Sequence, residues 1–206
     1  MTHPEQTPSP TPGRRDPEGR RAAILRAAAE LICESGVHGL THRAVAARAG
    51  VAVGSTTRYF TTINDLRAEA LRTLADDNER DLAGIADLIR DADLTDISSP
   101  ATRQAIADCA DVLHGFLSNT RQVHATLVML GTATTDAPLR TIALQWSDQL
   151  SDLLAAQVGT VRATAAVAYI DGVTVHAALH DTPVSRPALA AALTAIIGMP
   201  PTQEDQ

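Results

Sequence analysis

The residues best suited to chemistry in this chain are three arginines, Arg43, Arg48 and Arg58, which lie close together within residues 40–60. This stretch, LTHRAVAARAGVAVGSTTRYF, contains no aspartate or glutamate that would neutralise them. Uncompensated arginines are the electrostatic feature expected of a surface that contacts nucleic acid. The elements around them must therefore hold these side chains on an exposed surface.

The same stretch carries the signals of two short helices joined by a tight turn. Thr41 is a suitable N-cap, and Leu40 and Val45 flank it with the spacing of a hydrophobic staple. Gly50 follows the first helix, where a left-handed residue is needed to end it. A second helix is expected over about residues 53–60. This layout predicts a helix-turn-helix, whose second helix enters the DNA major groove.

Charge is divided unevenly along the chain, whose formal net charge is −7. Residues 1–60 hold eight arginines and five acidic residues, whereas residues 61–206 hold nine arginines and nineteen acidic residues. This asymmetry fits a basic nucleic-acid-binding head on an acidic body. Ordinary variation in surface charge is the alternative explanation.

Length and composition set the outer bounds of the fold. The 206 residues, 45% of them hydrophobic, suffice for one large domain or two small ones with a buried core. No run approaches the roughly 20 apolar residues of a membrane span, and the N-terminus lacks the apolar stretch of a signal peptide. Cys33 and Cys109 lie far apart in helix-like surroundings, which favours buried reduced thiols over a disulfide. We therefore expect a cytoplasmic protein without membrane contact.

Hydrophobic periodicity predicts an all-α fold without strands or internal repeats. A proline-rich disordered arm is expected over residues 1–17, a three-helix DNA-binding domain over 18–62, a helical domain over 63–199 and a tail over 200–206. Beyond the helix-turn-helix, helices are expected over about residues 63–89, 100–118, 121–134, 139–159, 161–180 and 186–197. The segment 161–180 is apolar nearly all round, which predicts burial on more than one side.

A pattern of specific residues runs through positions 20–66 of the chain. It consists of Thr41 to Ala46, Ala49-Gly50-Val51, Gly54, Tyr59-Phe60 and Leu66. With these residues the segment closely resembles the DNA-binding domain of the tetracycline-repressor (TetR) family of bacterial transcriptional regulators. The remaining chain is similar to the family in its length, its helical pattern and its Asp171-Gly172 pair.

The chain departs from the family pattern at three positions. Family members usually have serine, tyrosine and lysine where this chain has Ala52, Thr57 and Ile63. The tyrosine and lysine normally contact phosphates, so the chain lacks two common backbone contacts. Arg58 and the N-terminal arginines can replace them.

The resemblance implies DNA-contacting roles for individual residues of the head. Arg43 would lie near the floor of the groove, where a guanidinium binds guanine O6 and N7 in bidentate fashion. Thr41 and His42 would meet phosphate at the start of their helix, and Tyr59 would hydrogen-bond a phosphate. A solvated surface charge is the alternative for Arg43, and core packing is the alternative for Tyr59. The full expected set is Thr41, His42, Arg43, Gly54, Ser55, Thr57, Arg58 and Tyr59.

The resemblance also implies a C-terminal ligand-binding and dimerisation domain, and hence a repressor that a small-molecule effector releases from DNA. The long helix that begins near Ile63 directly follows the recognition helix, so its tilt would set the orientation of the head. An effector acts only through different affinities for the two orientations. A pocket is expected among the helices between residues 101 and 154, lined by Leu113, Phe116, Leu117, Leu127, Leu130 and Trp146.

A homodimer on a palindromic operator is expected because one helix-turn-helix reads too few base pairs to mark a single genomic site. The seam is predicted from segments 139–157 and 162–180, since the second segment is apolar around its circumference and rich in small residues. The interface residues expected are Trp146, Leu150, Ala166, Ile170, Val173 and Ala177.

Other chemistry is less well supported by the sequence. His176 and His180 have a spacing that can place two imidazoles on one metal, but only Asp171 is an obvious further ligand, so packing or a place in the seam is favoured. His114 and His124 can line the pocket or pack, and Cys109 has no basic neighbour in sequence that would activate it. No cofactor, no metal and no enzymatic activity are expected. A regulator controlled by a partner protein, or an enzyme with distant catalytic residues, remains the alternative.

Overall fold

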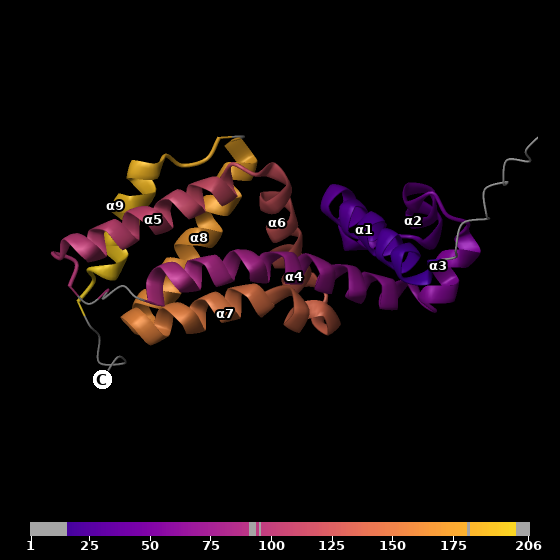
Figure 1. The fold of residues 1–206 in the computed structure, drawn as a ribbon, viewed down its shortest axis with the longest axis horizontal. Coiled ribbons are helices and arrows are strands. Elements are labelled where there is room, and N and C mark those ends of the chain that lie inside the picture. The colour runs from indigo at the N-terminus through magenta and orange to yellow at the C-terminus, as the bar shows by residue number, and fades with distance from the viewer. Residues whose placement is uncertain (1–15, 91–93, 95, 181, 201–206) are drawn as a thin grey trace, which may run out of the picture.

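The computed structural model describes residues 16–90, 94, 96–180 and 182–200, and within the long fourth helix it leaves the side chains of residues 77–83 and 89–90 undescribed. The elements within these ranges are helical, which confirms the all-α prediction (Figure 1). The helices are α1 (Pro17–Ser35), α2 (His42–Ala49), α3 (Val53–Tyr59), α4 (Ile63–Arg90), α5 (Pro100–Leu117), α6 (Thr120–Thr135), α7 (Arg140–Val158), α8 (Thr160–His180) and α9 (Arg186–Ile197), with 3₁₀ turns at Val37–Gly39 and Ala137–Leu139.

Helix α1 begins within the N-terminal arm that the sequence predicted over residues 1–17. Pro17 is already the first residue of α1, and the Asp16 side chain accepts a hydrogen bond from the Gly19 N–H at 2.9 Å. Proline suits the first helical position because it has no N–H to leave unsatisfied, and aspartate is a favoured N-cap. Residues 1–15 of the predicted arm and residues 201–206 of the predicted tail lie outside the described residues.

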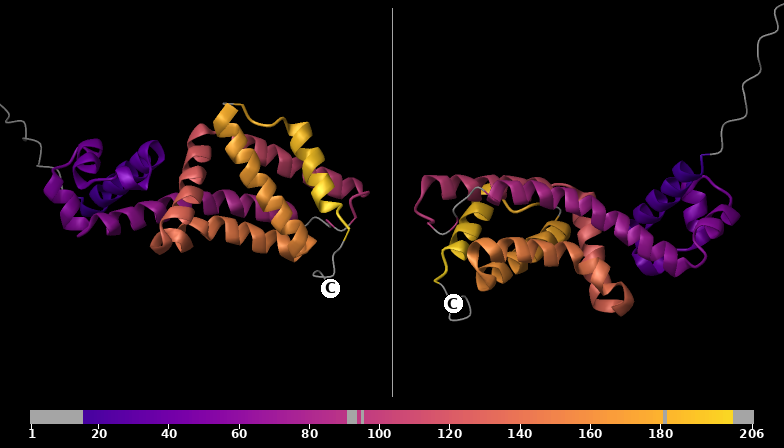
Figure 2. Two further views of the ribbon diagram at one scale, coloured as in Figure 1. Left: turned by 180° about the vertical axis from the view of Figure 1, so that it is seen from behind. Right: turned by 60° about the horizontal axis from the view of Figure 1, so that its bottom comes forward.

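The long helix α4 runs through most of the length of the molecule and joins its two halves (Figures 1 and 2). Its start is fixed by a reciprocal cap, in which the Thr62 N–H donates to Asp65 Oδ2 at 3.0 Å and the Asp65 N–H donates to Thr62 Oγ1 at 3.1 Å. Helices α1, α2 and α3 gather at one end of α4. Helix α7 packs along the other part of α4, where α5, α6, α8 and α9 complete the larger half.

The hydrophobic core continues across the domain boundary that the sequence predicted after residue 62. Leu66, Ala70 and Leu71, in the first turns of α4, are fully buried in the cluster that holds Ile24 of α1 and Val45 of α2. The same cluster continues into α6 and α7 through Ala125, Met129, Ala133 and Ala143. The small N-terminal half is therefore packed against the larger half as well as connected to it.

Among the described residues, no helix combines the length and apolar character needed to cross a membrane.

Candidate DNA-contacting head and regulatory cavity

The turn between α2 and α3 has the geometry that its residues predict. Thr41 Oγ1 accepts a hydrogen bond from the Ala44 N–H at 3.1 Å and caps α2. Gly50 ends α2 in the left-handed conformation, with φ 66° and ψ 32°, and the Val51 N–H then bonds to the Ala46 carbonyl at 3.0 Å. A residue with a Cβ would be strained at Gly50, so this glycine sets the angle at which α3 leaves α2.

Helix α3 is held against α2 by a buried threonine. Thr56 is fully buried, and its hydroxyl donates to the Val53 carbonyl at 2.7 Å. The His42 ring nitrogen Nδ1 lies 3.2 Å from the same hydroxyl, so the first residue of α2 contacts the middle of α3. Phe60 closes the end of α3 in the core. These contacts fix the inner face of α3 and leave its outer face to solvent.

The arginines of the head differ in how they are neutralised. Arg48 is paired with Glu34 at 2.6 Å and with Glu30 at 3.4 Å, both on α1, and the hydrogen bond from Arg48 lowers the pKa of the Glu34 carboxyl. Arg43 and Arg58 are exposed, and no residue in the described part of the chain forms an ion pair with them. Arg48 therefore joins α2 to α1, whereas Arg43 and Arg58 present unneutralised charge.

The structure brings the predicted DNA-contacting residues onto α2, α3 and the residue before α2. Thr41, Arg43, Gly54, Thr57 and Arg58 are exposed. The others, His42, Ser55 and Tyr59, are partly buried. Their contact with DNA is untested and stays a prediction.

The structure shows what surrounds Tyr59 and the three residues that depart from the family pattern. Tyr59 and Ile63 pack against the core of the head. The Tyr59 ring therefore contributes to packing, independently of any contact that its hydroxyl makes. The N-cap residue of α3, Ala52, makes no side-chain cap. Thr57 is exposed, and its hydroxyl donates to the Gly54 carbonyl at 3.3 Å, within the same helix.

Two arginines that the sequence did not single out tie the head to α4. The Arg67 guanidinium, on α4, lies 3.4 Å from the carbonyl oxygens of His38 and Leu40, in the segment that leads into α2. Arg21 of α1 pairs with Glu69 of α4 at 3.0 Å and lies over the Phe60 ring, 5.2 Å from its centroid. Because both cross between elements distant in sequence, local pattern gave no signal for them.

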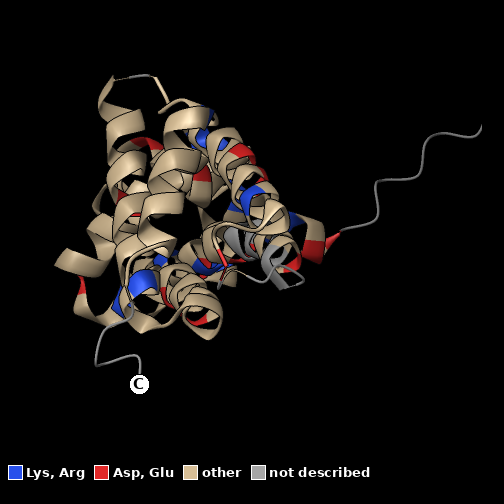
Figure 3. Ribbon diagram, turned by 90° about the vertical axis from the view of Figure 1, so that its left-hand side faces the viewer, with Lys and Arg blue, Asp and Glu red and all other residues tan. Residues whose placement is uncertain are grey.

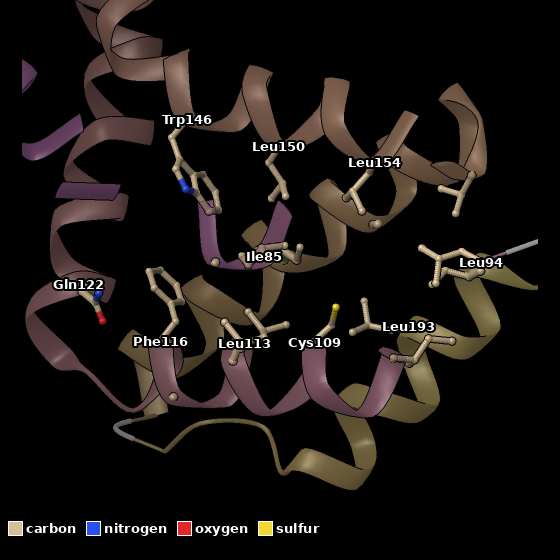
Figure 4. Close-up of a pocket in the computed structure, with 18 residues that line it drawn as sticks. Ile85, Leu94, Cys109, Leu113, Phe116, Gln122, Trp146, Leu150, Leu154 and Leu193 are labelled. Carbon is tan, nitrogen blue, oxygen red and sulfur yellow. The ribbon is translucent and has the colours of Figure 1, made fainter. Parts of the chain in front are cut away.

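The larger half contains a largely apolar cavity of about 410 Å³. This volume lies within the range of small-molecule sites, about 300–1,000 Å³. Helix α4 contributes Gly84 and Ile85 to its wall, so the helix that holds the head also touches the cavity (Figure 4). The other lining residues are Leu94, Ile106, Cys109, Val112, Leu113, Gly115, Phe116, Gln122, Trp146, Leu150, Leu154, Val158, Ala166, Ile170, Leu193 and Ile197.

Three of the six predicted pocket residues line this cavity: Leu113, Phe116 and Trp146. The other three, Leu117, Leu127 and Leu130, do not. Leu117 is buried in a core cluster with Val123 and Leu189, and Leu127 packs against that cluster. The side chains of Leu117 and Leu127 therefore pack against other helices, which their proximity in sequence to the pocket residues does not reveal.

Most residues of the predicted dimer seam are buried within the protomer, and the seam itself stays a prediction. Leu150, Ala166, Val173 and Ala177 are buried within the protomer itself, where Leu150 and Ala166 line the cavity and Val173 and Ala177 belong to a core cluster with α5 and α9. Trp146 and Ile170 also line the cavity. The apolar stripe of α7 and one face of α8 therefore pack within the protomer's own core.

His114 and His124 both lie outside the lining of the cavity. His114 Nδ1 lies 3.0 Å from the Val184 carbonyl and joins α5 to the segment before α9. His124 lines a shallow groove with Glu30, Cys33, Glu34, Thr120 and Arg121 rather than the cavity.

Within the described residues, neither the cysteines nor the exposed histidine pair belongs to a cluster of three or more potential metal ligands. Cys33 and Cys109 are free thiols, and burial raises the pKa of Cys109 to about 11. The exposed rings of His176 and His180 lie 4.3 Å apart, but within the described residues no third ligand joins them. The structure thus offers no reactive thiol at the cavity.

Comparison with known families gives a match to the head. The sequence model of the bacterial regulatory proteins of the tetR family matches residues 24–70, from α1 into the first turns of α4. This range includes the buried α4 residues that share the core of the head. No curated protein matches the chain.

Solved structures match nearly the whole molecule. A member of the TetR family from Streptomyces coelicolor A3 is 31% identical with a TM-score of 0.72, and the match covers 87% of this chain and 99% of that one. The multidrug binding protein EbrR in complex with malachite green is 32% identical with a TM-score of 0.72, over 88% of this chain and 99% of that one. A transcriptional regulator from Rhodococcus sp. Rha1 is 25% identical with a TM-score of 0.67, over 86% and 93% of the two chains. EbrR has also been solved with imidazole, proflavin and ethidium.

Proposed function

This chain belongs to the TetR family of bacterial regulatory proteins, and we propose that it is a transcriptional repressor that a small-molecule effector releases from a palindromic operator. The head supplies the DNA contacts. Exposed Arg43 and Arg58 provide unneutralised charge on α2 and α3, and the fixed inner face of α3 sets how they are presented. Action on DNA places the protein in the bacterial cytoplasm.

The observation that carries this proposal is the path of α4. Helix α4 starts four residues after the end of α3, holds the entry to α2 through Arg67, and reaches the cavity with Gly84 and Ile85. A ligand that changes the position of α4 at the cavity therefore changes the orientation of the head. The size of the effect is limited by the difference in ligand affinity between the two orientations.

The cavity and the relatives both support a small-molecule effector. The cavity is lined mostly by aliphatic side chains with two aromatic rings, as in sites for apolar ligands. EbrR, a relative over nearly its full length, binds several dyes. We infer that the effector of this chain is likewise a largely apolar molecule of drug-like size.

A homodimer is proposed through the outer faces of α8 and α9, in place of the seam expected from the sequence. These helices lie side by side at the surface of the larger half (Figure 2), and the ribbon seen from this end of the molecule is mostly tan, with few charged residues (Figure 3). Leu179 is 72% exposed and Val175 is 40% exposed. The exposed residues of α8 and α9 also include several small ones: Ala168, Gly172, Ala188, Ala191 and Ala195. Large exposed apolar side chains beside small residues suit close helix packing by a partner.

The direct test measures DNA binding and its release. The protein is titrated against the intergenic DNA beside its own gene in a gel-shift assay, and compounds that raise its melting temperature are then added to the complex. Binding of that DNA, and its release by a stabilising compound, is the expected result. Absence of sequence-specific binding would refute the regulator, and compounds that stabilise the protein without weakening the complex would refute effector release.

The same experiment separates the two alternatives. A regulator controlled by a partner protein would bind the DNA and be released by no compound in the library. An enzyme would turn over generic ester or phosphate substrates and bind no operator.

A further inference from the structure

Two histidines lie next to one another on the exposed face of α8. His176 and His180 are both exposed, and their ring centroids are 4.3 Å apart, with planes that differ by 38°. A spacing of four residues places two side chains on the same side of a helix, one turn apart. Both imidazoles are therefore accessible together from outside the protomer.

This arrangement is close to that of two imidazoles bound to one metal ion. Two histidines four residues apart on a helix are the pair that binds zinc in one class of metalloproteases. With each nitrogen about 2.0–2.1 Å from a tetrahedral ion, the centres of the two rings lie about 5 Å apart. The observed rings need to separate by less than about 1 Å, which rotation of two exposed side chains supplies. Imidazole is a ligand suited to Zn²⁺, Ni²⁺ and Cu²⁺.

One chain supplies only half of the ligands for a closed site of this kind. A structural zinc ion takes four nitrogen or sulfur ligands, and the described residues contain no group of three or more side chains placed to hold a metal. A two-fold axis presents the same surface patch of each copy to the other, so a second chain offers an identical pair of imidazoles. The site is thus incomplete in one copy and has its full ligand number in two.

The surface around the pair is suited to the approach of a second copy. Leu179, which lies between the two histidines in sequence, is 72% exposed, and Val175 is 40% exposed. Gly172, one turn before His176, is also exposed, and outside its own helical neighbours no atom lies within 4 Å of the position that a Cβ would take. Exposed apolar side chains favour cover by a partner, and a glycine lets another backbone come close. The pair lies on the face of α8 that the proposed dimer buries.

We propose that His176 and His180 of two copies together bind one divalent ion of the zinc type between the α8 helices and thereby tighten the dimer. The inference rests on the dimer of the proposed function and adds a ligand class that regulates it. An ion that binds the paired state and not the separate chains shifts the equilibrium toward the dimer. The concentration of free metal therefore sets how readily two heads are joined for a palindromic site.

The test uses the full chain, freed of metal by dialysis against a chelator, with Zn²⁺ as the probe. Sedimentation of a fluorescently labelled chain over a dilution series gives the dimer dissociation constant with and without Zn²⁺, and calorimetry gives the stoichiometry. We expect one Zn²⁺ for two chains and a dissociation constant at least tenfold lower in its presence. Co²⁺ in place of Zn²⁺ should show the intense visible absorption of a four-coordinate ion.

Single substitutions separate the metal site from general packing of the interface. His176→Asn and His180→Asn each remove one ligand from an exposed position, so each should keep the helicity of the wild type and lose the effect of Zn²⁺. The readout is the ratio of the dissociation constants with and without Zn²⁺, which a loss of packing alone leaves unchanged. His124→Asn is the matched control, because this exposed histidine lies beside Cys33 and Glu34 in the groove between α1 and α6. The effect of Zn²⁺ should persist in it.

Three results would overturn the shared site. They are the absence of zinc binding, binding of one ion per chain without a tighter dimer, and an effect of Zn²⁺ that survives in both asparagine variants. A gel shift on the same preparations distinguishes this inference from the proposed function. A dimer tightened by Zn²⁺ that binds no operator DNA would refute only the repressor, whereas a metal-free dimer that binds and releases DNA but takes up no Zn²⁺ would refute only the metal site.

Discussion

At the scale of single residues, Arg43 differs from its neighbour Arg48 in one respect that decides its role. Arg48 is held by Glu34 and Glu30, whereas Arg43 is exposed and has no ion-pair partner among the described residues. We predict that Arg43→Ala abolishes specific operator binding and leaves the melting temperature unchanged, because it removes a bidentate base contact worth about 1–3 kcal/mol together with a positive charge. Fluorescence anisotropy on operator and scrambled DNA measures this.

Arg48→Ala is the matched control for that prediction. It removes the same charge from the same helix, but its guanidinium points to the carboxylates of α1. The preference for operator over scrambled DNA should therefore survive in Arg48→Ala. Equal loss of preference in both variants would show that net charge, rather than a base contact by Arg43, carries specificity.

The thiol of Cys109 gives a prediction about pH. Burial raises its pKa to about 11 from an ordinary value of 9.0, so the folded state disfavours the thiolate. Below pH 9 the thiol is protonated in both states and contributes no pH dependence. Between about pH 9 and 11 only the unfolded state ionises, so the stability contributed by the neutral thiol is lost as pH rises. Cys109→Ser should show a shallower fall of the unfolding free energy over this window in urea titrations; identical slopes would contradict it.

The sequence predicted those residues whose signals are local. The Thr41 cap and the left-handed Gly50 follow from residues within one turn of each other, and both are found in the structure. Neutralisation of Arg48 was not predicted, because Glu34 lies fourteen positions earlier and meets it only once α1 and α2 have packed. Charge counted along a segment cannot distinguish an arginine that reads DNA from one that joins two helices.

At the scale of elements, α4 acts as a rigid connector only if it is attached to the head. The buried residues Leu66, Ala70 and Leu71 make this attachment, and Arg67 extends it to the entry of α2 by reaching two carbonyls there. We predict that Arg67→Met, which keeps the aliphatic stem, leaves ligand affinity within twofold but reduces the ligand-induced loss of operator affinity several-fold. Loss of these hydrogen bonds weakens the link between α4 and the entry of α2, so movement of α4 changes the orientation of α2 and α3 less.

Arg72→Met tests whether charge alone explains that result. Arg72 is exposed on α4 and pairs with Glu69 of the same helix at 2.7 Å, so it carries the same charge without linking α4 to the entry of α2. Ligand-induced release should be normal in this variant. Normal release in Arg67→Met as well, measured by anisotropy with and without a stabilising ligand, would remove Arg67 from the coupling path.

Helix positions were well predicted, and helix faces were not. The ends of α5, α6 and α9 differ from the expected ranges by one residue or none, since proline, asparagine and turn signals mark them. Helix α8 is apolar nearly all round, and periodicity cannot say which side meets the protomer's own core. The side with Ala166 and Val173 does so, and the sequence pattern had assigned these two residues to the dimer seam instead.

At the scale of the whole molecule, the two halves share one core, so the head cannot reorient without a response in α6 and α7. Met129 and Ala143 belong to the same buried cluster as Ile24 and Leu71. A continuous core transmits displacement because close-packed side chains leave no room to absorb it. In the proposed repressor, small movements at the cavity would therefore suffice to reorient the head, and pairing of two heads would multiply the effect on a palindromic site.

The proposed assembly can be tested at its most exposed residue. Leu179 is 72% exposed in the protomer, so a charge there does not disturb the protomer's core but would be buried without a partner in a dimer through α8 and α9. We predict that Leu179→Asp yields a monomer of unchanged helicity at micromolar concentration and weakens operator binding by at least tenfold, as measured by light scattering and anisotropy. Ala156→Glu, on the exposed face of α7, should leave both the dimer and its DNA affinity intact. A Leu179→Asp dimer, or a dimer lost instead in Ala156→Glu, would move the interface away from α8 and α9.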